Sequence, residues 1–184
     1  MAAWIALTDE PLSVAVNVSR RQLVSHLLVD DVSTALALTG VKPRQLILEV
    51  TESVLMENPE QVLSALTELQ ALGIRISVDD FGTGYSSLNH LQQFPADVLK
   101  IDKSFVDKLN VSEPGGSAMV ISIIGLAHSL SLEVVAEGIE REDQFERLIE
   151  LGCDYGQGYL MARPLDRQKS EALVEASQVA AAVP

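Results

Sequence analysis

Short runs of β-branched residues alternate along this chain with longer stretches that have helical spacing. Such alternation is typical of βα units, whose strands form a parallel sheet. The strand-like runs cover residues 12–17, 46–50, 74–80, 97–102, 132–137 and 154–160. The alternation therefore predicts an α/β fold built from successive βα units.

Two α/β architectures fit this pattern, a (β/α) barrel and a flat doubly wound sheet. The flat sheet usually has a Gly-rich phosphate-binding turn after its first strand, and residues 17–20 (NVSR) do not form one. We therefore favour a modified TIM-type (β/α) barrel. No linker or repeat interrupts the sequence, so we expect one domain over residues 1–184. Its barrel units would extend to about residue 166, and a closing helix and frayed tail would cover 167–184.

The helix after the second strand-like run has the clearest signals of start, face and end. Pro59 suits the first helical position, after Asn58 as a helix cap. Val62, Leu66 and Leu69 fall on one helical face and Gly73 follows the last turn. This residue pattern predicts an amphipathic helix from about residue 59 to 72.

The net charge of −13 and the pI near 4.5 argue against duplex nucleic acid or an anionic membrane as the main partner. An acidic surface also serves solubility in general. Cys153 is the single cysteine, which excludes an internal disulfide and a cysteine metal cage and fits a reducing compartment. No apolar stretch reaches the ~20 residues of a spanning helix, and the first residues lack the pattern of a signal peptide. We therefore expect a cytoplasmic location.

Polar or charged residues occur where the apolar strand-like runs end. They are Asn17, Glu49, Asp79, Asp80, Lys100, Asp102, Glu137 and Gln157. The carboxyl ends of barrel strands meet at one mouth, where the active sites of such folds lie. A single acid at a strand end is more often a helix cap or a solvated turn. Six consecutive strand ends with this character are better explained by a shared site.

Several carboxylates at one mouth repel each other and lose solvation unless positive charge lies among them. Lys100 alone cannot neutralise them. Divalent cations with oxygen ligands can, and carboxylate and amide oxygens suit Mg²⁺ or Mn²⁺ better than zinc. Two such ions ~3.5–4 Å apart can stabilise the attacking and leaving oxygens of a phosphoester displacement, and the adjacent Asp79 and Asp80 suit a bridge between them.

Some of these residues have a second interpretation. Lys100 lies in a run that should be buried, so it either forms a structural ion pair or orients a water or phosphate oxygen. Glu52 either anchors the glycine loop at 81–85 or begins an exposed turn. The helix around 119–130 is apolar enough to be core or to present a homodimer face.

The sequence resembles the EAL-domain family of bacterial cyclic-di-GMP phosphodiesterases. The matching stretches occur in the order of the family and span nearly the whole chain. They are VNVS (16–19), LEVTE (48–52), VDDFGTGYSSL (78–88), LKID (99–102), VAEGIE (135–140) and GQGYL (156–160). The resemblance implies a modified βα barrel that hydrolyses cyclic-di-GMP to linear pGpG with Mg²⁺ or Mn²⁺.

The resemblance also implies a role for each matching position. Asn17, Glu49 and Asp79 resemble ligands of one ion, with Asp79 shared and Asp80 serving a second ion. Three further matches resemble catalytic residues: Lys100 resembles the residue that holds the attacking water, Glu137 the base or a second-ion ligand, and Gln157 a member of the catalytic mouth. Two resemble supporting residues: Glu52 matches the glutamate that supports the loop, and Asp102 a residue behind the metal ligands.

One departure from the family concerns its first strand, which carries Glu-Ala-Leu with a metal-binding Glu. No such motif precedes Asn17, and we interpret the Glu-Ala-Leu at 171–173 as coincidence because it lies in the predicted last helix. We therefore expect a barrel that is incomplete at its N-terminus. A missing strand would expose strand edges, and a sensor or diguanylate cyclase domain would precede the chain in the intact protein.

Three functions are compatible with this sequence. The first is a truncated phosphodiesterase domain in which every retained catalytic position is intact. The second is a catalytically inactive module that binds cyclic-di-GMP or a protein partner. The third is a non-functional gene fragment, or a misassigned start.

Overall fold

The computed structural model describes residues 12–25, 27–56, 59–83, 91–109 and 114–181. Six parallel strands form one sheet and follow each other in chain order. The strands are β1 (Val14–Asn17), β2 (Leu46–Thr51), β3 (Arg75–Phe81), β4 (Val98–Ile101), β5 (Glu133–Ala136) and β6 (Tyr155–Gly156). The sheet curls into a half-barrel, which confirms the predicted α/β class and incomplete barrel.

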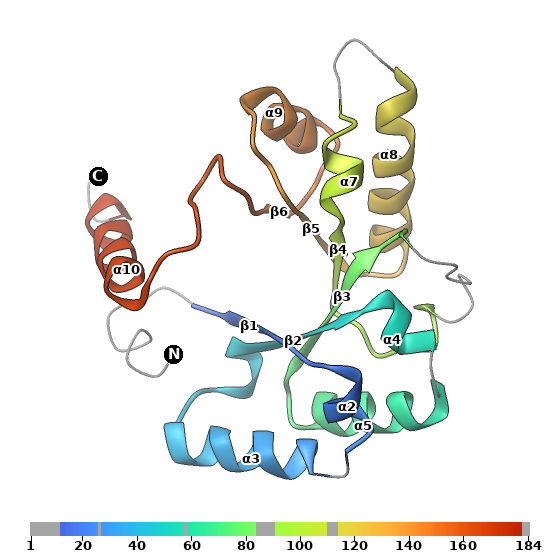
Figure 1. The fold of residues 1–184 in the computed structure, drawn as a ribbon, viewed down its shortest axis with the longest axis vertical. Helices are drawn as coiled ribbons and strands as arrows, with labels where there is room; N and C mark the ends of the chain where they lie inside the picture. Colours follow the sequence, from blue (N-terminus) through green and yellow to red (C-terminus); the bar gives the residue numbers. More distant parts are fainter. Residues whose placement is uncertain (1–11, 26, 57–58, 84–90, 110–113, 182–184) are drawn as a thin grey trace.

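Most helices cover the convex side of the sheet. The helices are α2 (Arg20–Leu23), α3 (Leu28–Thr39), α4 (Glu52–Met56), α5 (Pro59–Ala71), α7 (Lys103–Val106), α8 (Pro114–Ser129), α9 (Glu142–Glu150) and α10 (Arg167–Ala181), with a 3-10 turn η1 at Pro43–Gln45. In Figure 1, α3 and α5 lie along the β1–β3 half of the sheet and α8 and α9 along the β4–β6 half, while α10 stands apart. No helix among the described residues has both the length and the apolar character to cross a membrane.

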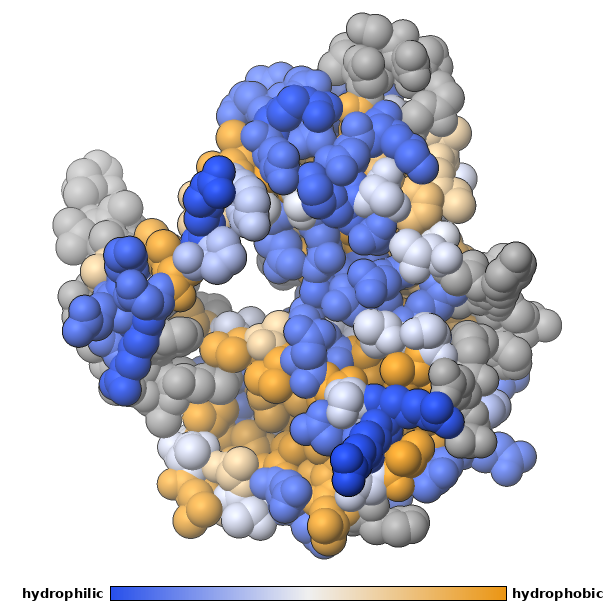
Figure 2. All heavy atoms as spheres, in the orientation of Figure 1, coloured by the Kyte–Doolittle hydropathy of each residue, from blue (hydrophilic) through white to orange (hydrophobic). Residues whose placement is uncertain are grey.

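The two faces of the sheet differ because neighbouring residues of a strand point to opposite sides. One set of strand residues, such as Leu48, Ile76 and Leu99, packs against the helices and forms the core. The other set faces a concave hollow of about 450 Å³, which charged residues such as Arg75 and Lys100 line. Figure 2 shows hydrophobic residues exposed around β1 and β2 and hydrophilic residues over α7 and α9.

Helix α5 has the predicted start, face and end. It begins at Pro59, and Val62, Leu66 and Leu69 are buried on one face. Gly73 has a φ of 86°, the left-handed conformation in which glycine commonly follows a helix. The proposed cap, Asn58, lies outside the described residues.

Some elements differ from their predicted extents. The segment after β1 is divided into α2 and α3, because the backbone turns at residues 24, 25 and 27. Helix α8 begins at Pro114, before the apolar stretch 119–130 that indicated a helix in the sequence. Strand β6 has only two residues, since the chain turns after Gln157 to pack on Ile139.

Candidate active site

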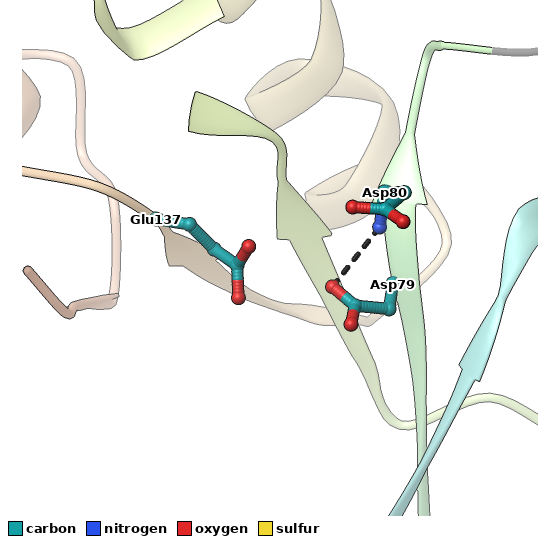
Figure 3. A group of neighbouring side chains, drawn as sticks. All are labelled: Asp79, Asp80 and Glu137. Carbon is teal, nitrogen blue, oxygen red and sulfur yellow. Dashed lines mark hydrogen bonds between the residues drawn. The ribbon is translucent and has the colours of Figure 1, made fainter. Parts of the chain in front are cut away.

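The end of β3 departs from regular strand geometry at the two adjacent aspartates. The pairing between β3 and β4 shifts register between Val78 and Phe81, as at a β-bulge. Asp80 has a φ of 55°, a left-handed conformation that aspartate tolerates better than most residues. The Asp80 amide donates a hydrogen bond of 3.0 Å to Asp79 Oδ1. This local distortion brings both carboxylates to the carboxyl end of the sheet, as Figure 3 shows.

Lys100, on β4, is buried and lies among carboxylates from three other segments of the sheet. Its Nζ atom is 2.7 Å from Glu49 Oε1, 3.2 Å from Asp79 Oδ1 and 2.5 Å from Glu137 Oε1. Glu49 is on β2, Asp79 on β3 and Glu137 directly after β5. The side chain of Lys100 is only 6% exposed, so solvent screens these contacts little.

Burial and the contacts of Lys100 shift the pKa values of the residues at this site. Burial alone would lower the pKa of Lys100, but its hydrogen bonds to Glu137 and Glu49 and the charge of Asp79 raise it above its ordinary value. Lys100 is therefore a protonated hydrogen-bond donor at neutral pH. Burial raises the pKa of Glu137 despite its contact with Lys100. Burial, together with the charges of Asp79 and Asp102, also raises the pKa of Asp80.

Glu137 and Gln157 are held together by a hydrogen bond and by two tight backbone turns. Gln157 Nε2 donates to Glu137 Oε1 at 2.7 Å. Gly138 follows Glu137 with a φ of 69°, and a Cβ there would overlap the side chain of Lys103. Gly158 follows Gln157, and a Cβ there would overlap the backbone of Ile139. A polar residue at a strand end, followed by glycine, is therefore a sequence signal for a site residue. The sequence analysis above does not use this signal for Gly138 and Gly158.

The other predicted site residues lie around this group. Glu52 begins α4, is 2% exposed and accepts a hydrogen bond of 2.7 Å from the Gly82 amide, so it is not in an exposed turn. Part of the glycine loop, residues 84 and 85, lies outside the described residues. Asp102 follows β4 and caps α7 by accepting from the Ser104 amide at 3.0 Å.

Asn17 lies at the edge of this group. It ends β1 opposite Glu49 in the strand register, and its side chain is exposed. Within the described part of the chain that side chain makes no hydrogen bond. Lys100, Glu49, Asp79, Asp80, Glu137 and Gln157 are therefore brought together, with Asn17 beside them.

The donors of this site fit a divalent cation. Asp79, Asp80 and Glu137 each offer a carboxylate oxygen, and these oxygens all lie within 4.8 Å of one another. The single charge of Lys100 faces three carboxylates, so the group keeps an excess of negative charge. Oxygen-only ligands are those that Mg²⁺ and Mn²⁺ prefer.

Comparisons with known proteins identify the family. The EAL domain model matches residues 1–164. Over 169 residues the chain is 43% identical to the bifunctional diguanylate cyclase/cyclic di-GMP phosphodiesterase MucR of Pseudomonas aeruginosa, covering 92% of this chain and 24% of MucR. It is 39% identical over 164 residues to the cyclic di-GMP phosphodiesterase RocR of the same species, covering 89% of this chain and 42% of RocR. The chain thus spans less than half of either relative.

Solved structures agree with the sequence matches. The PaMucR phosphodiesterase in complex with c-di-GMP superposes with a TM-score of 0.86 at 42% identity, covering 92% of this chain and 68% of that one. A manganese/cy-diGMP complex of Klebsiella pneumoniae BlrP1 superposes with a TM-score of 0.80 at 30% identity, covering 89% of this chain and 42% of that one. Motifs, half-barrel and family match all agree, and this chain belongs to the EAL-domain family.

Proposed function

We propose that this chain carries the catalytic mouth of a cyclic-di-GMP phosphodiesterase, which hydrolyses one phosphodiester to give linear pGpG. The observation that carries the proposal is the burial of Lys100 among Glu49, Asp79 and Glu137. Buried carboxylates at the carboxyl end of a βα sheet destabilise the fold, so their presence there supports a catalytic role. The relatives MucR and RocR are phosphodiesterases by name, which supports the substrate class.

In this proposal the acidic residues hold Mg²⁺ or Mn²⁺. Glu49, Asp79, Asp80 and Glu137 would supply carboxylate oxygens, and Asn17 an amide oxygen. Bound divalent cations would neutralise the phosphate and lower the pKa of a bound water. The manganese complex of BlrP1 supports this choice of metal.

The protein residues would then position the reactants. Lys100 has three N–H donors and no acceptor, which suits it to hold the oxygen of the attacking water or of the phosphate. Glu137, with Gln157 fixing one of its oxygens, would accept the proton of the water. The water oxygen bonds to phosphorus, the bond from phosphorus to one ribose 3′-oxygen breaks, and that oxygen takes up a proton. The product is a linear dinucleotide with a 5′-phosphate.

The proposal is tested by incubating the purified 184-residue chain with cyclic-di-GMP and Mn²⁺ and separating the products by chromatography. We expect pGpG from the wild-type chain, none in excess EDTA, and a loss of about 100-fold or more for Asp79→Asn. Product formation that persists in EDTA or in Asp79→Asn would contradict the assigned roles. Circular dichroism of the variant provides the control for folding.

A second function is favoured by the exposure of Asn17, an expected ligand that lies on the edge strand β1. In this alternative the chain binds cyclic-di-GMP without cleaving it and acts as a regulatory module. Binding of cyclic-di-GMP by calorimetry, with no pGpG after prolonged incubation, would support this alternative and refute catalysis by the chain.

A further inference from the structure

The segment that joins β5 to α9 begins with Glu137 and is held at its other end by a fully buried glutamine of α9, Gln144. Gln144 is 0% exposed. Its Oε1 atom accepts hydrogen bonds from the amides of Glu140 and Arg141, at 2.9 and 3.0 Å. Its Nε2 atom donates to the Val106 carbonyl at 3.1 Å. Burying a side-chain amide is costly unless its polar atoms are paired, and here both ends are paired.

The two ends of the Gln144 side chain have different roles. Its oxygen caps the first turn of α9 by accepting from the Arg141 amide, and a glutamate at this position would cap it in the same way. Its Nε2 atom is not needed for the cap, because Val106 lies 38 residues earlier in the chain, in α7. A glutamate carboxylate has no N–H for that bond. Glutamine at this buried position therefore indicates that the bond to α7 has a role of its own.

This bond connects the segments that carry Lys100 and Glu137. Helix α7 follows β4, which carries Lys100, and Glu137 directly follows β5. The Glu137 amide donates to the Ile101 carbonyl at 3.1 Å, so the start of the joining segment is held against β4. Gln144 holds the end of the segment against α7 through Val106. Both ends are thus tied to the same neighbour, and the 2.5 Å contact between Lys100 Nζ and Glu137 Oε1 lies at this junction.

Arg141 makes a second link between the same elements. Its Nη2 atom donates to the Leu109 carbonyl, just after α7, at 3.0 Å. Its Nε atom is 2.9 Å from Asp143 Oδ1, and the side chain of Arg141 is 47% exposed. Because solvent competes for the bonds of an exposed side chain, we expect this link to be weaker than the buried one.

From these contacts we infer that Gln144 is a positioning residue for the hydrolysis, which fixes Glu137 relative to Lys100 by binding Val106 of α7. Gln144 is fully buried, so it acts through Glu137 and not on the substrate. The inference rests on the proposed function, because it gives Glu137 a part in the reaction. A shift of about 1 Å in a reacting group can lower a rate by about 100-fold, so a single buried link of this kind has a measurable effect.

The test compares the wild type with Gln144→Glu, which keeps the acceptor for α9 and loses the donor to Val106. Rates of pGpG formation in saturating Mn²⁺ should show kcat lowered by about tenfold or more and KM changed by less than about threefold, since the substrate contacts remain. Calorimetric titration should show Mn²⁺ binding weakened by about threefold or more, because Glu137 is one of three acids whose oxygens lie within 4.8 Å of one another. Arg141→Ala should lower kcat by about twofold to fivefold.

Gln45→Glu is the matched control, because Gln45 has the same pair of contacts at the amino end of the sheet. Its Oε1 atom accepts from the Lys42 amide at 3.0 Å, and its Nε2 atom donates to the Leu12 carbonyl at 3.2 Å. The same substitution there should leave kcat and Mn²⁺ binding unchanged.

Unchanged kcat and Mn²⁺ binding in a folded Gln144→Glu protein would overturn the inference, and so would equal losses in Gln45→Glu. If circular dichroism shows that Gln144→Glu does not fold, Arg141→Ala decides, and wild-type kcat and Mn²⁺ binding in that variant overturn the inference. A wild type that binds Mn²⁺ without forming pGpG refutes the proposed function alone, and the Mn²⁺ titrations then decide the inference. A wild type that does neither refutes both.

Discussion

The two ends of the sheet both carry carboxylates, but the partners of these carboxylates differ. At the amino end, Asp97 Oδ2 accepts from the Ile76 amide and Asp154 Oδ2 from the Val134 amide, both at 2.8 Å. Each of these acids precedes one strand and ties it to the start of its neighbour. At the carboxyl end, three carboxylates share the ammonium of Lys100.

This difference distinguishes acids that stabilise the fold from acids that serve the function of the site. Each amino-end acid has an N–H donor of its own, and the ion pair between Arg75 and Glu133 nearby also joins one acid to one base. The carboxyl-end acids outnumber their cation, which is unfavourable for folding and favourable for binding a metal. The same substitution of an acidic residue should therefore affect stability and metal binding differently at the two ends of the sheet.

The largest effect is expected for Lys100→Ala, which leaves Glu49, Asp79 and Glu137 without their shared cation. Removing one partner of a buried ion pair typically destabilises by about 3–5 kcal/mol. Urea unfolding of the variant in EDTA should show this loss, and Mn²⁺ should restore more stability to the variant than to the wild type. Equal effects of Mn²⁺ on both proteins would contradict the excess of negative charge.

Asp97→Ala should come next, with a loss of about 1–3 kcal/mol, because the Ile76 amide is left without its acceptor. Urea unfolding in EDTA should show that this loss is smaller than for Lys100→Ala. Mn²⁺ should shift the stability of the variant and of the wild type equally, since Asp97 is at the other end of the sheet. A larger stabilisation of Asp97→Ala than of the wild type by Mn²⁺ would contradict the proposed difference between the two ends of the sheet.

Asp80→Asn should change the free energy of unfolding by a smaller amount, and it should stabilise the protein instead of destabilising it. The pKa of Asp80 is raised by burial and by Asp79 and Asp102, so the ionised form is less favourable in the folded chain than in the unfolded one. Removing that charge should stabilise the metal-free protein at pH 7 by up to about 1 kcal/mol, measured by urea unfolding, and should reduce pGpG formation. A destabilised Asp80→Asn protein would contradict this account.

The smallest effect concerns Asp154 and pH. Burial alone would raise the pKa of Asp154, but hydrogen bonds from His128 and from the Val134 amide hold it below the ordinary 3.8. A lowered pKa in the folded state contributes stability above pH 3.8, and this contribution is lost as the pH falls through the folded value. Asp154→Asn should therefore be less stable than wild type by less than about 1 kcal/mol at pH 7, and this difference should shrink as the pH falls below 3.8. Thermal unfolding across this pH range measures the difference, and a difference that grows in acid would refute the prediction.

The sequence predicted the elements whose signals are local. Helix α5 has a proline at its start, three apolar residues on one face and a glycine at its end, and each signal has a direct structural cause. The polar strand ends were also visible, because a charged residue such as Lys100 stands out in an apolar run.

The geometry of the site depends on contacts between distant segments, which the sequence does not display. The left-handed Asp80 coincides with a register shift in the pairing of β3 with β4. The burial of Glu52 depends on the Gly82 amide, 30 residues away. The sequence predicts Asp97 as part of a strand, whereas its carboxylate accepts a hydrogen bond from the Ile76 amide of the neighbouring strand.

The most direct test of the difference between the two ends is calorimetric titration of Mn²⁺ into three proteins: wild type, Asp79→Asn and Asp97→Asn. Both variants remove one negative charge from the same sheet, so they differ in position and not in net charge. We predict that Asp79→Asn weakens Mn²⁺ binding by about tenfold or more and that Asp97→Asn binds as the wild type does. Equal binding by all three proteins, or no binding by the wild type, would contradict a metal site at the carboxyl end of this sheet.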